Sequence, residues 1–186
     1  MKIMLIRHGQ TAANRERRFL GQTDEPLTPE SRLELAGRAY PEADVLFSSP
    51  LLRCRQTAEI IYPGLPCRVV DDLREMDFGI FEGKTNEEMC DEPFYQEWLA
   101  AGRADFPGGE TMAAFRERCL TSFLAAADTL APTDRAAFVV HGGVIMALMS
   151  NLGSGDFYDF LCGNGDGYLC RFEQGRLIQE AKLTAE

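Results

Sequence analysis

The sequence has no run of eighteen or more apolar residues and no low-complexity tract. A helix needs such a run to cross a bilayer, so membrane-spanning segments are not expected. Of the 186 residues, 45% are hydrophobic and 26% are charged, which is typical of a folded globular protein and not of a disordered chain. A chain of this length can bury a substantial core, and we predict a single domain over residues 1–186.

Basic residues are scarce, since 19 Lys and Arg stand against 29 Asp and Glu, and the formal net charge is −10. Nucleic acids and anionic membranes are bound through basic surfaces, so neither is an expected partner. A small anionic substrate held in a local basic pocket is compatible with this charge.

Signals for metal binding and secretion are also missing. The six cysteines include no C-x-x-C pair, and only two histidines accompany them. We therefore expect no metal site and no cofactor, and we predict that the cysteines are buried free thiols. The N-terminal MKIMLI lacks the small-residue cleavage site of a signal peptide, so a cytoplasmic location is expected.

Short β-prone runs alternate with helical patterns along the chain. Strands are predicted at residues 2–6, 44–48, 67–70 and 136–140. Two of the helices between them share one device, because Thr28 and Ser49 are each followed by proline and are expected to be helix caps. In the helix after Thr28, the spacing predicts a buried face that contains Leu33, Ala36 and Tyr40.

This alternation predicts an α/β fold, a three-layer α/β/α sandwich with a mostly parallel central sheet. The C-terminal segment is expected to add a hairpin at the edge of the sheet, turning at Gln174 and Gly175. Residues 74–110 break the alternation with turns, a Thr85…Glu88 capping-box pattern and a group of aromatic residues. We predict that they form a small insertion over one end of the sheet.

Both histidines stand in the same context, an apolar strand followed by His and Gly, in IMLIRHG and AFVVHGG. Loops at the carboxyl ends of parallel strands line the ligand crevice of an open α/β sheet, so His8 and His141 are expected to face one region. A single buried histidine is often structural, but the repeated context favours a site.

Arginines accompany these histidines. Arg7 leaves a buried strand directly and needs an anionic partner, because an unpaired buried charge costs several kcal/mol. Arg53 and Arg55 lie early in a helix, where cations are unfavourable unless an anion offsets them. A guanidinium group can donate two parallel hydrogen bonds to one phosphate, so these residues together predict a phosphate pocket. Both Arg53 and Arg55 remain candidates for it.

Phosphoryl transfer also needs a nucleophile and an acid for the leaving oxygen. A neutral imidazole can be the nucleophile when a hydrogen bond holds its other nitrogen. The segment LREMDFGIFEG offers Glu75, Asp77 and Glu82 as acids, and their spacing does not choose among them.

The ordered motifs RHGQTAAN, GQTDEPLT, SSPLLRCRQTA, DLREMDFGIFEG, PGGET…FRER and VVHGG cover most of the chain. Together they resemble the histidine phosphatase superfamily, the phosphoglycerate-mutase-like proteins, and within it the small phosphatases such as α-ribazole phosphatases. Two departures, Ser31 in place of the usual Gly and Phe81 in place of a frequent Trp, do not bear on the chemistry.

The resemblance implies a role for each matching residue. His8 is the implied nucleophile that becomes phosphohistidine, Glu75 the proton donor, and Arg7, Arg53 and His141 the phosphate pocket. It also implies substrate contacts from Thr11, Asn14, Gly21 and the Gly142 amide, and a structural turn at Glu82 and Gly83. Arg53 is thereby preferred over Arg55, and Glu75 over Asp77.

These roles predict a metal-independent phosphomonoesterase that acts on a small-molecule phosphate ester, with α-ribazole phosphate or a related metabolite as a candidate. A phosphoglycerate mutase is the nearest alternative, but residues 84–109 are acidic and offer only Lys84 and Arg103 as cations for a substrate carboxylate. A silent phospho-ligand binding module is a third hypothesis, although such a protein would be expected to lose His8 or Glu75.

The aromatic residues of the insertion leave one question open. Phe94, Tyr95 and Trp98 have the spacing of a helix face, which more often packs in a core than binds a flat leaving group.

Overall fold

A computed structural model describes residues 1–102 and 105–184, and its centre is one six-stranded sheet with the order β3-β2-β4-β1-β5-β6. The strands are β1 (Lys2–Arg7), β2 (Val45–Ser48), β3 (Cys67–Val69), β4 (Arg135–Val140), β5 (Gly167–Glu173) and β6 (Arg176–Leu183). The first four pair in parallel, and β5 and β6 add two antiparallel strands at one edge. The predicted strands and the mostly parallel sheet are confirmed.

The edge hairpin turns where the sequence predicts. Gln174 and Gly175 join β5 to β6, and both have positive φ angles, of 51° and 74°. Two residues in the left-handed region suit the twist of a tight hairpin, and the second of them is a glycine, for which this conformation carries no steric cost.

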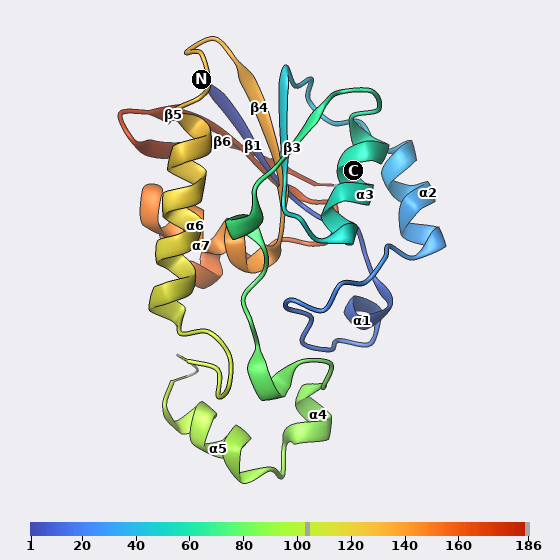
Figure 1. Cartoon of the computed structure of the whole chain (residues 1–186), viewed down its shortest axis with the longest axis vertical. Coiled ribbons are helices and arrows are strands. Elements are labelled where there is room, and N and C mark those ends of the chain that lie inside the picture. The colour runs from blue at the N-terminus through green and yellow to red at the C-terminus, as the bar shows by residue number, and fades with distance from the viewer. Residues whose placement is uncertain (103–104, 185–186) are drawn as a thin grey trace.

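Helices cover both faces of the sheet, as Figure 1 shows, so the three-layer sandwich is confirmed. The α-helices are α1 (Ala12–Arg15), α2 (Pro29–Gly37), α3 (Leu52–Ile61), α4 (Asn86–Met89), α5 (Pro93–Ala100), α6 (Met112–Ala127) and α7 (Gly142–Leu152). Three 3-10 turns are η1 (Asp71–Leu73), η2 (Gly79–Phe81) and η3 (Phe157–Phe160). Helices α6 and α7 pack on one face, and α3 packs on the other with α2 beside it.

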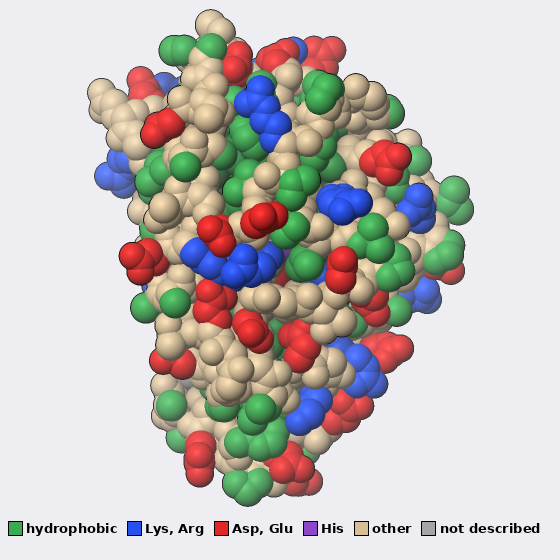
Figure 2. All heavy atoms as spheres, viewed as in Figure 1, with side chains coloured by type: hydrophobic (Ala, Val, Ile, Leu, Met, Phe, Trp, Pro, Cys, Tyr) green, Lys and Arg blue, Asp and Glu red, His purple; other side chains and the backbone are tan. Residues whose placement is uncertain are grey.

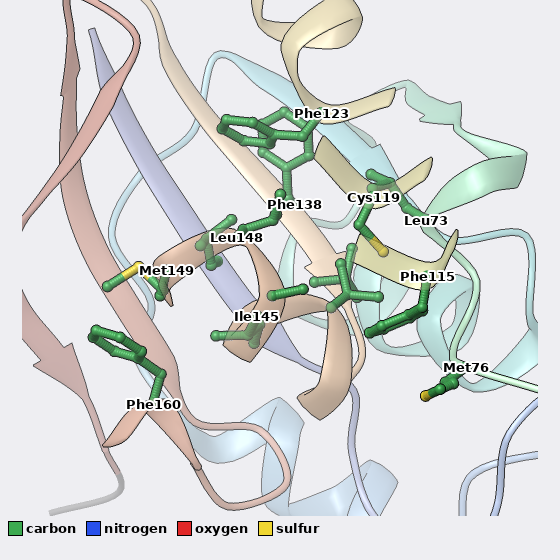
Figure 3. Close-up of a cluster of buried hydrophobic side chains, with 14 of the residues drawn as sticks. Leu73, Met76, Phe115, Cys119, Phe123, Phe138, Ile145, Leu148, Met149 and Phe160 are labelled. Atoms are coloured by element: carbon green, nitrogen blue, oxygen red, sulfur yellow. The ribbon is translucent and has the colours of Figure 1, made fainter. Parts of the chain in front are cut away.

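Successive side chains of a strand face opposite sides of the sheet, so the protein has a hydrophobic core on each side of it. Ile3 and Leu5 of β1 face the layer of α6 and α7, whereas Met4 and Ile6 face α3. Figure 3 shows the larger core, in which Phe123 of α6 meets Phe138 of β4 with ring centroids 5.0 Å apart. Because β1 and β4 are buried on both faces, the residues that follow them emerge from a rigid support.

Two details of the predicted helices are wrong. Helix α3 begins two residues later than expected and its N-cap is Leu51, while the Ser49 hydroxyl contacts His141 and accepts from the Leu51 amide, just before the helix. In α2, Thr28 is the cap as predicted, but Leu33 and Ala36 are exposed, Leu33 to 77%. The buried residues of α2 are Ser31 and Leu35, because the side of α2 that faces α3 is rotated about the helix axis from the predicted side.

The cysteine prediction is only partly correct. All six cysteines are free thiols, and three of them, Cys54, Cys119 and Cys170, are buried. Cys67 and Cys90 are exposed, since Cys67 lies on the edge strand β3 and Cys90 follows the short helix α4.

The segment at residues 74–110 holds η2, α4 and α5, and Figure 1 shows α4 and α5 lying beyond the carboxyl ends of the parallel strands. The predicted Thr85–Glu88 capping box forms there. Arg103, one of the two cations predicted in this stretch, lies outside the described residues.

The described part of the chain has no helix that combines the length and the apolar character needed to cross a bilayer. On the face drawn in Figure 2, Lys and Arg side chains are interspersed with Asp and Glu side chains. Ion pairs join some of the basic and acidic side chains of the protein, for example Arg135 with Asp44 and Arg118 with Glu110.

Candidate active site

The two histidines lie together at the carboxyl ends of adjacent parallel strands. Arg7 of β1 pairs with Val140 of β4, so the next residues, His8 and His141, leave the sheet side by side. Their ring centroids are 5.2 Å apart, with 65° between the ring planes. The expectation that both imidazoles face one region is confirmed.

His8 is held in one tautomer. Its Nδ1 lies 2.7 Å from the carbonyl oxygen of Gly9, and since a carbonyl can only accept, Nδ1 carries the proton. The lone pair is therefore on Nε2. Burial, with the nearby guanidinium groups of Arg53 and Arg7, holds the pKa of His8 well below its ordinary value, so the ring is neutral at pH 7.

The loop after His8 is fixed by side chains that are distant in sequence. The Gly9 amide donates to Thr57 of α3, and Asn164 donates to the carbonyl oxygens of His8 and Gly9. A Cβ at Gly9 would lie 2.6 Å from atoms of Ser31 and Leu35, so the close approach of α2 requires glycine here.

Arg53 is completely buried and donates to two backbone carbonyls, those of Gly21 at 2.6 Å and Thr23 at 2.8 Å. Arg7 donates to the carbonyl of Cys162 at 2.6 Å. Neither arginine has a carboxylate partner within the described residues, and the Nε atom of each is buried without a hydrogen bond. Both cations are thus oriented but not neutralised, which suits them to an anion.

His141 is the N-cap residue of α7 and is also fully buried. Its Nε2 lies 2.7 Å from the Ser49 hydroxyl and 3.5 Å from the Cys54 sulfur. Burial is the main cause that keeps the pKa of His141 well below its ordinary value, and Arg53 adds to it. His141 is therefore a second neutral imidazole with a fixed orientation.

Glu75 is the carboxylate that reaches this site. It is 7% exposed, and it accepts hydrogen bonds from the Met76 amide at 3.0 Å and the Gly143 amide at 3.1 Å. Burial raises the pKa of Glu75 above its ordinary value despite these bonds, which favours a protonated carboxyl that can donate a proton. A Cβ on Gly143 would lie 2.4 Å from Glu75 Oε1, so only glycine permits this approach.

The two other candidate acids hold loops in place by accepting hydrogen bonds from backbone amides. Asp77 accepts from the amide of Gly79, and Glu82 accepts from the amides of Gly21 and Thr23. Glu82 therefore holds the loop whose carbonyls anchor Arg53. Gly83 has a φ of 74°, which agrees with the expected turn.

A cavity of about 380 Å³ opens beside these residues. One end is polar and is lined by Arg7, Asn14, Glu75, Gly142 and Gly143. The walls are largely apolar, with aromatic side chains from four segments of the chain, namely Phe19, Phe78, Tyr95, Trp98, Phe106, Phe115, Phe157 and Tyr158. His8, Arg53 and His141 are buried and are not among the residues that line this cavity.

The residues expected to contact substrate fall into two groups. Asn14 and Gly142 line the cavity. Thr11 is buried and caps α1, and both backbone polar groups of Gly21 are engaged, with Glu82 and Arg53. For these two, a direct contact with substrate stays a prediction.

Three contributing residues were not identified from the sequence. Ser49 contacts His141, Asn164 holds the loop after His8, and Arg118 of α6 donates to the carbonyls of Asp72, Arg74 and Glu75. Each bond joins segments at least 43 residues apart, and the signal that might have indicated Asn164 was its place in a Gly-rich turn. Within the described residues, no group of three or more His, Cys, Asp or Glu side chains has the arrangement of a metal site.

Comparison with known families agrees with this geometry. The family model described as the histidine phosphatase superfamily (branch 1) matches residues 3–180. The chain therefore belongs to the histidine phosphatase superfamily.

Relatives within this family carry both phosphatase and mutase names. A probable phosphoglycerate mutase, GpmB, of Cronobacter sakazakii is 35% identical over 82% of this chain and 74% of its own length. An uncharacterized phosphatase, PhoE, of Bacillus subtilis is 33% identical over 83% of this chain and 78% of its own length.

Solved structures show the same fold. A putative α-ribazole-5'-P phosphatase from Escherichia coli superposes with a TM-score of 0.86 over 99% of this chain and 96% of its own, at 24% identity. A phosphoglycerate mutase from Thermus thermophilus superposes with a TM-score of 0.76 over the full length of both chains, at 34% identity.

Proposed function

We propose that the protein is a metal-independent phosphomonoesterase that hydrolyses a small-molecule phosphate ester through a phosphohistidine at His8. The observation that carries this proposal is the meeting of three groups in one place. They are a neutral imidazole with its Nε2 lone pair free, two arginines that have no carboxylate partner among the described residues, and a buried Glu75 at the polar end of the cavity.

The first step transfers the phosphoryl group from the ester to the protein. His8 Nε2 attacks phosphorus as the ester P–O bond breaks, and Glu75 gives its proton to the leaving oxygen. Arg7, Arg53 and His141 lie around the transferring group, and the arginines stabilise the charge spread over its oxygens.

The second step returns the phosphoryl group to water. Glu75, now a carboxylate, takes a proton from the attacking water as the phosphorus–nitrogen bond to His8 breaks. Inorganic phosphate leaves, and Glu75 and His8 regain their starting protonation states. No metal ion is needed in this scheme, because imidazole is the nucleophile and fixed guanidinium groups stabilise the charge.

The lining of the cavity favours hydrolysis of an ester with an apolar leaving group over mutase activity. A mutase must also hold the carboxylate of a phosphoglycerate. The further cation in this lining, Arg18, is already bonded to Glu16 and Glu88. Because mutase names occur among the relatives, transfer to a sugar acid is the alternative to be tested.

The substrate proposal is tested with a panel of phosphate esters. We put α-ribazole phosphate first, since α-ribazole phosphatases are among the solved structures with this fold, followed by phosphoglycerates, sugar phosphates and nucleotides. Release of inorganic phosphate from one class with high kcat/KM supports hydrolysis. Interconversion of 2- and 3-phosphoglycerate without phosphate release would support the mutase.

The intermediate is tested by rapid quenching with a labelled ester. We expect an acid-labile, base-stable phosphoprotein in the native chain and none in His8→Ala. Label that persists in His8→Ala would overturn the assignment of the nucleophile.

A further inference from the structure

Ser49 and His141 lie side by side because the strands that precede them are paired. Ser49 follows β2 and His141 follows β4, and the Ser49 amide donates to the carbonyl oxygen of Val139 at 3.1 Å. Both side chains are completely buried, and the Ser49 hydroxyl lies 2.7 Å from His141 Nε2. Backbone pairing therefore fixes both partners of this hydrogen bond.

The direction of the bond follows from the groups around it. The Leu51 amide donates to Ser49 Oγ at 3.4 Å, so this oxygen already accepts one proton. The Ser49 hydroxyl proton can go to His141 Nε2 or to the neighbouring Cys54 sulfur, and sulfur is the weaker acceptor. Burial raises the pKa of Cys54, and the proton that this thiol keeps is donated to the carbonyl oxygen of Val140 at 3.5 Å. The Ser49 hydroxyl is therefore the donor and His141 Nε2 the acceptor.

This direction decides the tautomer of His141. A neutral imidazole has one N–H group and one lone pair, so a lone pair on Nε2 places the proton on Nδ1. Among the described residues, Nδ1 has one partner, the Cys54 sulfur at 3.7 Å, which is a weak acceptor. The opposite tautomer would leave a buried lone pair on Nδ1 beside a thiol whose proton is already bonded.

The two histidines then offer opposite groups to a ligand. In His8, Nδ1–H is bonded to the carbonyl oxygen of Gly9, so the ring presents the lone pair of Nε2. In His141, Nε2 is bonded to Ser49, so the ring presents Nδ1–H. A nucleophile needs a lone pair, whereas a phosphoryl oxygen needs a donor.

We propose that Ser49 is a positioning residue for phosphoryl transfer, which holds His141 in the Nδ1–H tautomer so that His141 donates a hydrogen bond to the transferring group. This inference rests on the proposed phosphatase function and adds to it a role for a buried serine. Without the hydroxyl, Nε2 can take the proton. A lone pair on Nδ1 would then face phosphoryl oxygens, which it repels.

The tautomer is measured without substrate, by long-range ¹H–¹⁵N NMR of the imidazole nitrogens at pH 7.5. The chain has only two histidines, so a spectrum of His8→Ala assigns both. For His141 we expect a pyrrole-type Nδ1 and a pyridine-type Nε2 in the native protein and in Ser49→Thr, which keeps the hydroxyl. In Ser49→Ala the proton is expected to move to Nε2. Ser48→Ala is the matched control, because Ser48 is equally buried and its hydroxyl donates to the Ser49 carbonyl oxygen.

Steady-state kinetics with phenyl phosphate measures the consequence for the reaction. Ser49→Ala is expected to lower kcat about tenfold, the size of one lost hydrogen bond, and to change KM less than about twofold. The loss falls on kcat because the bond is made to the group that is being transferred. Ser49→Thr should recover most of kcat, and Ser48→Ala should stay within about twofold of the native protein.

Two results would overturn this role of Ser49 and leave hydrolysis intact. One is a native His141 with its proton on Nε2. The other is a Ser49→Ala variant in which either the tautomer or kcat is unchanged, because the serine would then act through packing or not at all. Absence of phosphate release from every ester by the native protein would refute the proposed function, and the inference with it.

Discussion

Two regions of this protein meet at the cavity, and they are built in opposite ways. The sheet end that holds His8 and His141 is buried and pinned by backbone pairing between β1 and β4. The covering segment at residues 74–110 adds short helices and aromatic side chains and contributes Tyr95 and Trp98 to the cavity. Under the proposed function, the nucleophile and its phosphate-binding neighbours lie at rigid strand ends, whereas the covering segment supplies the proton donor Glu75 and much of the aromatic wall that meets the leaving group.

The largest effect is expected from the arginine that lies deepest. Arg53→Ala removes a proposed phosphate ligand and leaves the carbonyls of Gly21 and Thr23 without their donor, so kcat/KM is expected to fall about 10²- to 10³-fold. Steady-state kinetics on any accepted ester measures this. Arg55→Ala is the control on the same helix, because Arg55 is exposed. Similar losses in the two variants would contradict the assignment.

The proton donor is tested by comparing variants of two nearby acids, Glu75 and Asp77. Glu75→Gln cannot protonate the leaving oxygen, and kcat is expected to fall about 10²-fold or more on an alkyl phosphate and much less on an aryl phosphate with a good leaving group. Asp77→Asn should retain activity, because Asp77 accepts from a loop amide. A loss that does not depend on the leaving group would argue against acid catalysis by Glu75.

Glycine at position 143 supports Glu75 by leaving space for it. In Gly143→Ala the new methyl group would lie 2.4 Å from Glu75 Oε1, so the carboxyl must move and kcat is expected to fall about tenfold or more. Gly37→Ala is the matched control, since nothing lies within 4 Å of a Cβ there. Full activity in Gly143→Ala would show that the position of Glu75 matters little.

The sheet end should also make stability depend on pH. His8 and His141 have pKa values well below the ordinary 6.5, so the unfolded chain binds more protons than the folded chain below that pH. Stability is therefore lost as the pH falls, by up to ~1.4 kcal/mol per pH unit for each histidine. Glu75, with its raised pKa, has the opposite sign, and its contribution is lost as the pH rises above 4.5.

Urea unfolding in phosphate-free buffer between pH 7.5 and 5.5 measures this dependence. Replacing one histidine, as in His141→Gln, should flatten the slope, whereas replacing an exposed lysine such as Lys182 should not. An unchanged slope in His141→Gln would contradict a neutral, buried ring.

The smallest effect is expected from Trp98, in the covering segment at residues 74–110. Trp98 lines the cavity but also packs on Phe81 and Phe106, with ring centroids 4.9 Å and 5.1 Å away. Trp98→Ala is expected to lower kcat/KM about threefold to tenfold for phenyl phosphate and less for an aliphatic ester. Trp98→Phe should retain most of the preference for phenyl phosphate over an aliphatic ester. An equal loss on both esters would assign Trp98 to packing alone.

The aromatic residues of the cover show why sequence spacing has limits. Tyr95 and Trp98 are mostly buried and still line the cavity, so packing and lining are not alternatives for them. Phe94 lies against Phe81 and beneath Lys84 and is absent from the lining. A helical period predicts that residues share a face, but it does not predict what that face meets.

What the sequence by itself determined is local or repeated: the strands, the Thr28 and Thr85 caps, the hairpin turn and the two strand–His–Gly segments, because short-range sterics and hydrogen bonds encode them. The ordered motifs also placed the chain in its family. Tertiary structure alone decided that Ser49 contacts His141 across 92 positions of sequence and that Asn164 holds the His8 loop. These contacts depend on how whole layers pack, and no local pattern carries that information.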